Sequence, residues 1–250
     1  MDESRSKQAF LESLQPIGEG DELVFRCDPQ VSCFNECCAD LELELSPYDV
    51  LRLRRGLGLP SGELLDRHAR IAIEEQTGLP HVFLKMETDE RRSCPFVDPS
   101  GCTVYGDRPG ACRTYPLGRG AQVDPSGQVS VRWVVVREDH CRGFDEGRAW
   151  SLRDWIADQG LAEYDAFNDQ YLALQNEWRQ RVFRPSRDLT GMAILALFRL
   201  DDFRNLLYRR TPESLGLDEA GKARVVEDEN TRLEFGFKWL RNMVRQLGGA

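Results

Sequence analysis

Eight cysteines dominate the chemistry that this sequence can perform. All of them lie in the first 141 of the 250 residues. They are Cys27, Cys33, Cys37, Cys38, Cys94, Cys102, Cys112 and Cys141. Cysteines that served only as small core residues would be scattered along the chain, so this confinement predicts a shared purpose. Thiolates bind soft metal ions such as zinc and iron, and they hold iron–sulfur clusters.

The first four cysteines form a compact loop motif, Cys27-x5-Cys33-x3-Cys37-Cys38. Short spacings allow a loop to wrap its thiolates around one ion or cluster, because few chain conformations must be frozen. Adjacent side chains point in different directions. We therefore predict that Cys37 and Cys38 serve different centres, or that only one of them is a ligand. A disulfide between these neighbours is a strained alternative.

The second group, Cys94, Cys102 and Cys112, lies in a loop region at residues 92–120 that is dense in Pro, Gly, Asp and Arg. Each of these cysteines sits close to a Gly or Pro, as metal-binding loops built from turns require. The spacing alone is uninformative, but together with the turn residues it favours a metal site.

Two arginines, Arg108 and Arg113, lie on either side of Cys112. Positive charges lower the pKa of a thiol and offset the negative charge of a thiolate cluster. The alternative is that these arginines form surface ion pairs with Asp107 or Asp98.

Disulfide bonds are the competing explanation for an even number of cysteines. They belong to oxidising compartments and to small domains without a core. This chain is long enough to bury a core, and its N-terminus lacks the basic and then apolar pattern of a secretion signal. We therefore expect a cytoplasmic protein with reduced thiols, in which such a pattern indicates metal or redox chemistry.

Charge and hydropathy exclude other classes of protein. The 33 Lys and Arg residues against 42 Asp and Glu residues give a net charge of −9, which disfavours a surface for nucleic acid or anionic membranes. Hydrophobic residues make up 41% and charged residues 30%, a balance typical of soluble globular proteins. No apolar run approaches the roughly 18 residues of a membrane helix. We expect no nucleic-acid or membrane partner, and the identity of any protein partner or substrate stays open.

Short strands and helices must position the cysteine loops. Composition and alternation predict a short helix at residues 7–14 and strands at residues 23–25, 41–45, 81–86 and 129–136. Ser46-Pro47-Tyr48-Asp49 predicts a helix start with a capping box, and this helix would end at Gly56 or Gly58. A second helix is predicted to begin near Ser61 and to continue through Ile73.

The composition changes after Gly147, where cysteine disappears and long amphipathic runs begin. Helices are predicted at residues 151–155, 161–183, 189–208 and 230–246. The fold class is therefore α+β, a small cysteine-rich metal-binding α+β domain followed by an all-helical C-terminal region. The predicted division is an N-terminal helix or tail at residues 1–20, a cysteine-cluster domain at 21–148 and a helical region at 149–250.

A set of motifs across residues 22–145 carries a family resemblance. They are Phe25-Arg26-Cys27, Cys33, Cys37-Cys38, the helix start at Leu45-Ser46-Pro47-Tyr48-Asp49-Val50, Cys94-Pro95-Phe96, and the stretch from Cys102 through Tyr105, Asp107, Arg108, Pro109, Gly110 and Cys112 to Pro116. With these motifs the chain resembles the YkgJ-type cysteine-cluster family. Its members are bacterial and are described as zinc- or iron-chelating or as iron–sulfur proteins with eight characteristic cysteines. Many members have a tighter C-x2-C-x2-CC arrangement than the gaps of five and three residues seen here.

The resemblance implies a metal but no particular reaction. Thiolate ligands exclude magnesium and calcium without deciding between iron and zinc. The ferredoxin spacings and the C-x2-C knuckle of zinc fingers are both absent. The family description favours an iron–sulfur cluster over zinc, and we expect all eight cysteines to be ligands.

Three functions follow as hypotheses. The first is an iron–sulfur protein with a redox or modifying role, in which the first cysteine loop shares the ligation with Cys94, Cys102, Cys112 and Cys141. The second is a non-catalytic interaction module with structural four-thiolate zinc sites. The third is a metal-dependent modifying enzyme, because the cysteine cluster is similar to that of flagellin lysine methylases. Whether the protein is an enzyme is not decided by the sequence.

Overall fold

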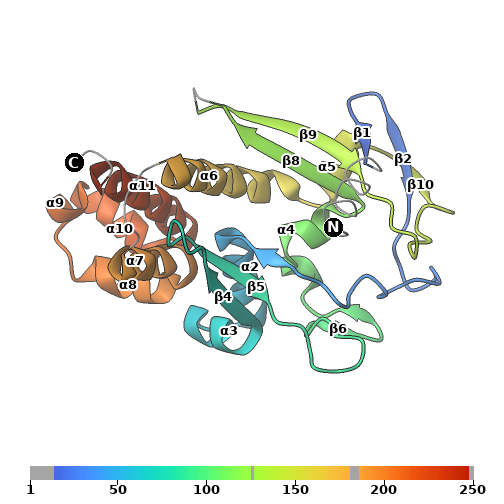
Figure 1. Cartoon of the computed structure of the whole chain (residues 1–250), viewed down its shortest axis with the longest axis horizontal. Helices are drawn as coiled ribbons and strands as arrows, with labels where there is room; N and C mark the ends of the chain where they lie inside the picture. Colours follow the sequence, from blue (N-terminus) through green and yellow to red (C-terminus); the bar gives the residue numbers. More distant parts are fainter. Residues whose placement is uncertain (1–13, 125–126, 181–185, 248–250) are drawn as a thin grey trace. The chain divides into compact units, whose positions relative to one another are not determined.

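The computed structural model describes residues 14–124, 127–180 and 186–247, and they form an α+β fold (Figure 1). The strands lie in small sheets, and helices dominate the C-terminal region. The predicted fold class is confirmed. The helix predicted at residues 7–14 falls almost entirely outside the described residues. Within those residues, no helix combines the length and apolar character needed to cross a membrane.

The contacts divide the chain into two compact units, each built from two segments. Unit 1 contains the described residues up to Leu41 together with Met86–Asp165, and it includes all eight cysteines. Unit 2 contains Glu42–Lys85 and the described residues from Ala166 onward. The chain thus leaves unit 1 and returns to it between the two cysteine groups. The predicted domain boundaries at residues 20 and 148 stay predictions.

The described residues of unit 1 form three small antiparallel sheets. The first sheet has the strand order β1 (Gln15–Ile17), β9 (Val129–Val135), β8 (Leu117–Val123). The second pairs β10 (Arg148–Ser151) with β2 (Glu22–Phe25), and the third pairs β6 (Val97–Asp98) with β7 (Gly101–Cys102). Its helical elements are η1 (Tyr105–Asp107), α4 (Gly110–Thr114), α5 (Leu152–Asp158) and the first residues of α6 (Leu161–Gln180). The strands predicted at residues 23–25 and 129–136 are confirmed as β2 and β9. β10 is a strand at the start of the region predicted to be helical.

The core of unit 1 forms around Phe25, the last residue of β2. The Phe25 ring makes edge contacts with Phe144 and Trp155, at centroid distances of 5.1 and 5.7 Å. The next residue, Arg26, donates its backbone N–H to the carbonyl of Gly143 at 2.9 Å. A Cβ added to Gly143 would lie 2.5 Å from the Arg26 carbonyl oxygen, so this close approach requires glycine. The pairing brings the start of the first cysteine loop to the segment around residue 141.

In the part that the structure describes, unit 2 combines one sheet with most of the helices. The sheet has the order β3 (Glu44–Leu45), β5 (Pro80–Leu84), β4 (Ala69–Ile73). The helices are α2 (Pro47–Leu57), α3 (Ser61–His68), the remainder of α6, α7 (Arg187–Phe198), α8 (Leu200–Tyr208), α9 (Pro212–Leu215), α10 (Glu219–Glu227) and α11 (Glu229–Leu247). The predicted helices at residues 161–183 and 230–246 correspond to α6 and α11.

The start of α2 follows the predicted capping box. The Asp49 N–H donates to Ser46 Oγ at 3.2 Å, and the Ser46 N–H donates to Asp49 Oδ2 at 2.8 Å. Pro47 is the first helical residue, and Gly58 ends the helix with a left-handed φ of 66°. The sequence prediction for this helix is confirmed.

Two helix predictions are wrong. Residues 69–73 do not continue α3 but form β4, in which Ile71 pairs with Val82 of β5. Apolar residues at positions 69, 71 and 73 fit a strand as well as a helix, and the available partner strand decides between them. The predicted helix at residues 189–208 is broken at Arg199, whose φ of −118° and ψ of 59° are not helical. The strand predicted at residues 41–45 is confirmed only for Glu44–Leu45.

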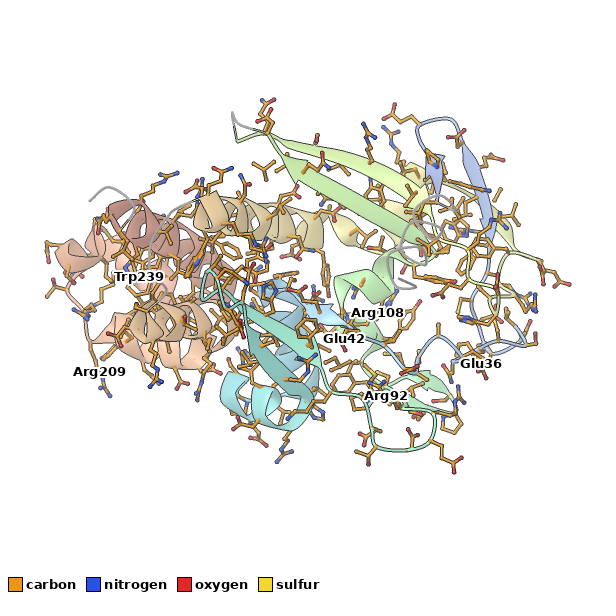
Figure 2. All side chains as sticks on the ribbon, viewed as in Figure 1. Glu36, Glu42, Arg92, Arg108, Arg209 and Trp239 are labelled. Carbon is orange, nitrogen blue, oxygen red and sulfur yellow. The ribbon has the colours of Figure 1, made fainter. Side chains whose placement is uncertain are left out.

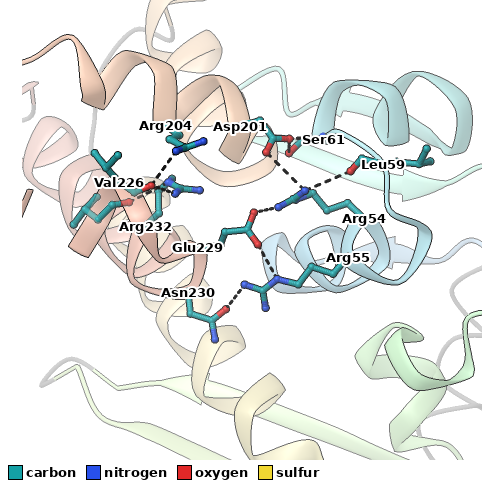
Figure 3. Close-up of polar contacts among 11 residues, drawn as sticks. Arg54, Arg55, Leu59, Ser61, Asp201, Arg204, Val226, Glu229, Asn230 and Arg232 are labelled. Atoms are coloured by element: carbon teal, nitrogen blue, oxygen red, sulfur yellow. Dashed lines mark hydrogen bonds and ion pairs between the residues drawn. The ribbon is translucent and has the colours of Figure 1, made fainter. Parts of the chain in front are cut away.

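A polar network joins α2 and α3 to the C-terminal helices inside unit 2 (Figure 3). The backbone N–H and the hydroxyl of Ser61 donate to Asp201 Oδ2 at 2.7 and 2.8 Å. Arg55 Nε donates to Glu229 Oε2 at 2.8 Å. Arg232 is 2% exposed, and its guanidinium donates to carbonyls at the end of α10. Buried charges with such partners fix the register of these helices.

The close packing of α11 on α7 can be tested by substitution. A Cβ added at Gly236 would lie 2.6 Å from the Ala196 carbonyl oxygen, a backbone atom that cannot rotate away. We expect Gly236→Ala to lower the free energy of unfolding by about 1–3 kcal/mol, although alanine is the better helix former. Gly191→Ala in α7 is the matched control, because its added Cβ meets no atom within 4 Å. Urea unfolding should show no loss for Gly191→Ala, and an equal loss in both variants would contradict this packing.

Candidate metal centre

All eight cysteines lie in unit 1, and none of them forms a disulfide bond. Cys27 and Cys112 are exposed, and the other six are half-buried. No disulfide joins any pair of them, so the disulfide alternative does not describe this structure.

Four of the thiols, Cys27, Cys33, Cys37 and Cys141, are neighbours and are called site A. Desolvation of its sulfur and the nearby thiols of the other three members raise the pKa of Cys27 to about 11, although the residue as a whole is exposed. Cys33 Sγ accepts the backbone N–H of Arg142 at 3.1 Å, and Cys33 and Cys141 interact through their sulfurs. Site A therefore joins three cysteines of the first loop to one that lies far away in the sequence.

The remaining four thiols, Cys38, Cys94, Cys102 and Cys112, are called site B. The pKa of Cys38 is raised by its hydrogen bond with Cys37, by burial, and by the proximity of Cys37, Cys94 and Cys112. Burial is the main cause that raises the pKa of Cys94, to which Cys102 also contributes. The backbone N–H of Cys94 donates to the Cys38 carbonyl at 2.8 Å. Site B thus combines one residue of the first loop with the second cysteine group.

The adjacent pair Cys37 and Cys38 lies where the two sites meet. A hydrogen bond between the two sulfurs lowers the pKa of Cys37 to about 7 and raises that of Cys38. Beyond this contact, Cys37 is close to Cys27 of site A, and Cys38 is close to Cys94 and Cys112 of site B. Two different centres for these neighbours stay a prediction, with which this proximity agrees.

The four sulfurs of each site lie near one another, but they are not arranged as the coordination sphere of a metal. Among the residues that the structure describes, no three His, Cys, Asp or Glu side chains are grouped so that they could hold a metal ion. The ligand role of the eight cysteines therefore stays a prediction.

Backbone N–H groups are directed at sulfurs in both sites. In three cases the donor lies two residues after the cysteine: Phe96 for Cys94, Val104 for Cys102 and Gly143 for Cys141. Each bond favours the thiolate and lowers the pKa of its cysteine, although burial keeps the net shift of all three upward. Hydrogen bonds of this kind orient thiolate ligands and tune the metal that they hold.

A buried positive charge lies beside site B. Arg108, beside the start of α4 (Figure 2), is 7% exposed and lies close to Cys102 and Cys112 of site B. Its guanidinium stacks on the Tyr105 ring at 3.6 Å and donates to the Gln159 side chain. The charge of Arg108 works against the burial that raises the pKa of Cys102.

Arg113 anchors the same segment from its other side. It is 9% exposed, and its Nη1 donates to the Gln159 carbonyl at 2.8 Å. Its guanidinium also lies over the Tyr164 ring at 4.9 Å. Both arginines are buried, which does not fit ion pairs at the surface.

Comparison with known families identifies the segment that contains both sites. Residues 26–142 match the family model of the CxxCxxCC domain, which is described as "Putative zinc- or iron-chelating domain". We call residues 26–142 the CxxCxxCC domain, after the family model that they match. The predicted resemblance to a cysteine-cluster family is confirmed, and the family description supports binding of zinc or iron. No curated protein and no solved structure matches the chain.

The residues of the CxxCxxCC domain fit such a metal. Each site offers four sulfur donors, and thiolates select zinc and iron over hard cations. The N–H donors at the sulfurs and the buried charge of Arg108 both stabilise thiolates. The donor chemistry of the chain therefore agrees with the family description.

An open pocket in the CxxCxxCC domain borders site B. It is lined by Cys38 and Cys94 and by the carboxylates of Glu87, Asp89 and Asp98, among others. Hydrogen bonds from neighbouring serines lower the pKa of Asp89 and Asp98, so both are ionised at neutral pH. One side of site B is thus open to solvent beside negative charge.

Two residues near the sites were not singled out by the sequence. Gln159 contacts both buried arginines from the end of α5, and no local pattern marks it. The Tyr115 hydroxyl faces Cys141. Its position directly after a short cysteine-bearing helix was the signal that could have found it.

Proposed function

We propose that the CxxCxxCC domain of this chain carries two metal centres, one at site A and one at site B, and that each holds an iron–sulfur cluster. The observation that carries this proposal is the separation of eight thiols into two sets of four, with Cys37 in one and Cys38 in the other. Four cysteines are the usual ligand set of an iron–sulfur cluster.

The surroundings of the sulfurs support this occupant. N–H bonds to sulfur and nearby positive charge are features by which proteins set the reduction potential of iron–sulfur clusters. Site A has N–H donors from Arg142 and Gly143. Site B has N–H donors from Phe96 and Val104 and the buried Arg108 beside it.

A redox or modifying role in the cytoplasm follows as part of the proposal. When bound, a cluster would supply electron transfer or substrate activation. The pocket beside Cys38 and Cys94 would let a substrate or partner approach site B.

Structural zinc is the second candidate. Two segments that carry five of the eight sulfurs, at residues 26–40 and 138–147, consist mainly of turns and irregular backbone. Closed four-thiolate zinc sites hold such loops in place, which would make the domain a non-catalytic interaction module.

Purification without oxygen separates these candidates. Iron with acid-labile sulfide and a brown visible spectrum would support the clusters, whereas about two zinc ions per chain and no colour would support the structural module. The control is a variant with Cys27→Ser and Cys102→Ser, one substitution in each site, prepared in the same way. It should lose the metal of both sites, and a wild-type protein with no more metal than this variant would overturn the proposal.

A further inference from the structure

Strand β4 has one edge that no other described strand covers. The sheet of unit 2 has the order β3-β5-β4, so β5 is the one strand neighbour of β4 in the part of the chain that the structure describes (Figure 1). An edge strand presents backbone N–H and C=O groups that are ready to pair with another strand. The outer edge of β4 is therefore a candidate interaction surface.

The hydrogen bonds to β5 determine which residues of β4 face this outer edge. Just beyond β4, Glu74 donates its N–H to the Leu79 carbonyl at 2.9 Å, in the same register as the strand pair. Hydrogen-bonded pairs alternate along an antiparallel ladder, so the even-numbered residues of β4 bond to β5. The backbone groups of Ile71 and Ile73 therefore point to the open edge.

The side chains of Ile71 and Ile73 form an apolar row at this edge. They lie on the same face of the sheet as Val82 of β5, which is opposite Ile71 in the ladder and fully buried. Yet Ile71 is 39% and Ile73 is 44% exposed. Arg70 does not shield the row, because its guanidinium lies over the Phe83 ring at 4.5 Å, on the opposite face. A further strand beside β4 would cover both isoleucines.

The charges at the two ends of β4 favour a second copy of this strand as the partner. Arg70 lies near the start of the strand, and Glu74 and Glu75 follow its end directly. When two identical strands pair in antiparallel fashion, the basic start of each lies beside the acidic end of the other. With Ile71 opposite Ile73 of the second copy, Arg70 is directly opposite Glu74, and opposite charges at such positions stabilise a strand pair.

Both of these charged side chains also have partners within their own chain. Arg70 donates to Glu42 in a pair whose side chains are 51% and 69% exposed. Arg179 donates to Glu74 at 3.4 Å, and this pair is partly exposed as well. Exposed ion pairs contribute little free energy. The partners within the chain therefore do not prevent a pairing between Arg70 and Glu74 of two copies.

We propose that β4 pairs in antiparallel fashion with β4 of a second copy of this chain. The two three-stranded sheets would join into one sheet across a twofold axis. Ile71 of each copy exchanges backbone hydrogen bonds with Ile73 of the other, and the apolar rows cover each other. Because the strands are short, the dimer is weak and reversible. No cysteine takes part, so this inference does not depend on the proposed metal centres.

Sedimentation velocity of the full-length protein tests for this dimer. A reductant is present so that disulfide-linked dimers do not form. A dimer should appear as the protein concentration rises from micromolar to near-millimolar. Ile71→Lys places a charge in the apolar row and should raise the dimer dissociation constant about 10-fold or more. Val131→Lys is the control at a similarly exposed residue, 38%, in β9 of unit 1, and it should change nothing.

Amide hydrogen exchange followed by NMR distinguishes pairing through this edge from any other dimer. The N–H groups of Ile71 and Ile73 should exchange fast in dilute protein and slowly in concentrated protein. Those of Arg70 and Ala72, which bond to β5, should be protected at both concentrations. This measurement needs no substitution, so it decides the question even where a variant folds poorly.

Three results would overturn the proposal. One is a chain that stays monomeric at every concentration, because a second copy is then not the occupant of the edge. Another is a dimer that Ile71→Lys does not weaken. The third is a dimer in which the amides of Ile71 and Ile73 stay unprotected.

Discussion

Cys37→Ser should empty one metal centre and leave the other filled, and Cys38→Ser should do the reverse. The reason is that Cys37 neighbours the thiols of site A, whereas Cys38 neighbours those of site B. A serine hydroxyl is a poor ligand for soft metals. Each single variant should therefore retain about half of the wild-type metal, and the double variant almost none.

Alkylation identifies which centre survives. In Cys37→Ser, the site B cysteines Cys94, Cys102 and Cys112 should stay protected from iodoacetamide, while the remaining site A cysteines react. Mass spectrometry of the digested protein measures this directly. Ser32→Ala, an exposed change in the same loop, should leave the metal content unchanged.

Two other results would reject the division into two sites. Full metal in both single variants would mean that neither neighbour is a ligand. Complete loss in each single variant would mean that all eight thiols serve one centre.

Removing the metal should lower the folding stability of unit 1 far more than that of unit 2. In metal-dependent domains the binding free energy is folding free energy, about 10–16 kcal/mol for structural zinc sites in small peptides. The segments of unit 1 at residues 26–40 and 138–147 are built from turns. Unit 2 has its own buried residues, such as Trp178, Phe203 and Phe237, and needs no sulfur ligand.

Hydrogen exchange followed by mass spectrometry measures this difference. After treatment with a strong chelator, peptides from the two turn segments should lose protection, while those from α2, α7 and α11 should keep it. The variant with Cys27→Ser and Cys102→Ser should exchange like the chelated protein from the outset. Equal loss of protection in both units would contradict this separation.

Local features of the fold were predictable from the sequence. The capping box at Ser46 and Asp49 specifies the start of α2 within four residues. The turn residues between the first cysteines predict a loop, and the adjacent pair already suggested two centres. These predictions depend only on neighbouring residues, whose conformations constrain each other directly.

Grouping of the thiols was not predictable in the same way. Cys141 joins the first cysteine loop because β2 pairs with β10 and because Arg26 bonds to Gly143. No spacing between Cys27 and Cys141 indicates this pairing. For the same reason β4 was mistaken for helix: its partner β5 is a tertiary feature, and the periodicity of residues 69–73 alone is ambiguous.

Site B lies at the base of a long loop of the chain, and this position has a thermodynamic consequence. Cys38 and Cys94 flank this loop, residues 39–93. Its base is closed by an Ala39–Ser93 bridge and by the Asp40 N–H bond to the Arg92 carbonyl. A metal bound by both sulfurs would act as a reversible crosslink around that loop. Loop-closure entropy for a link of this span is worth about 4 kcal/mol, because the unfolded chain loses freedom. Cys27 and Cys141 would enclose this loop within a second, larger one, so both centres would restrain the denatured ensemble.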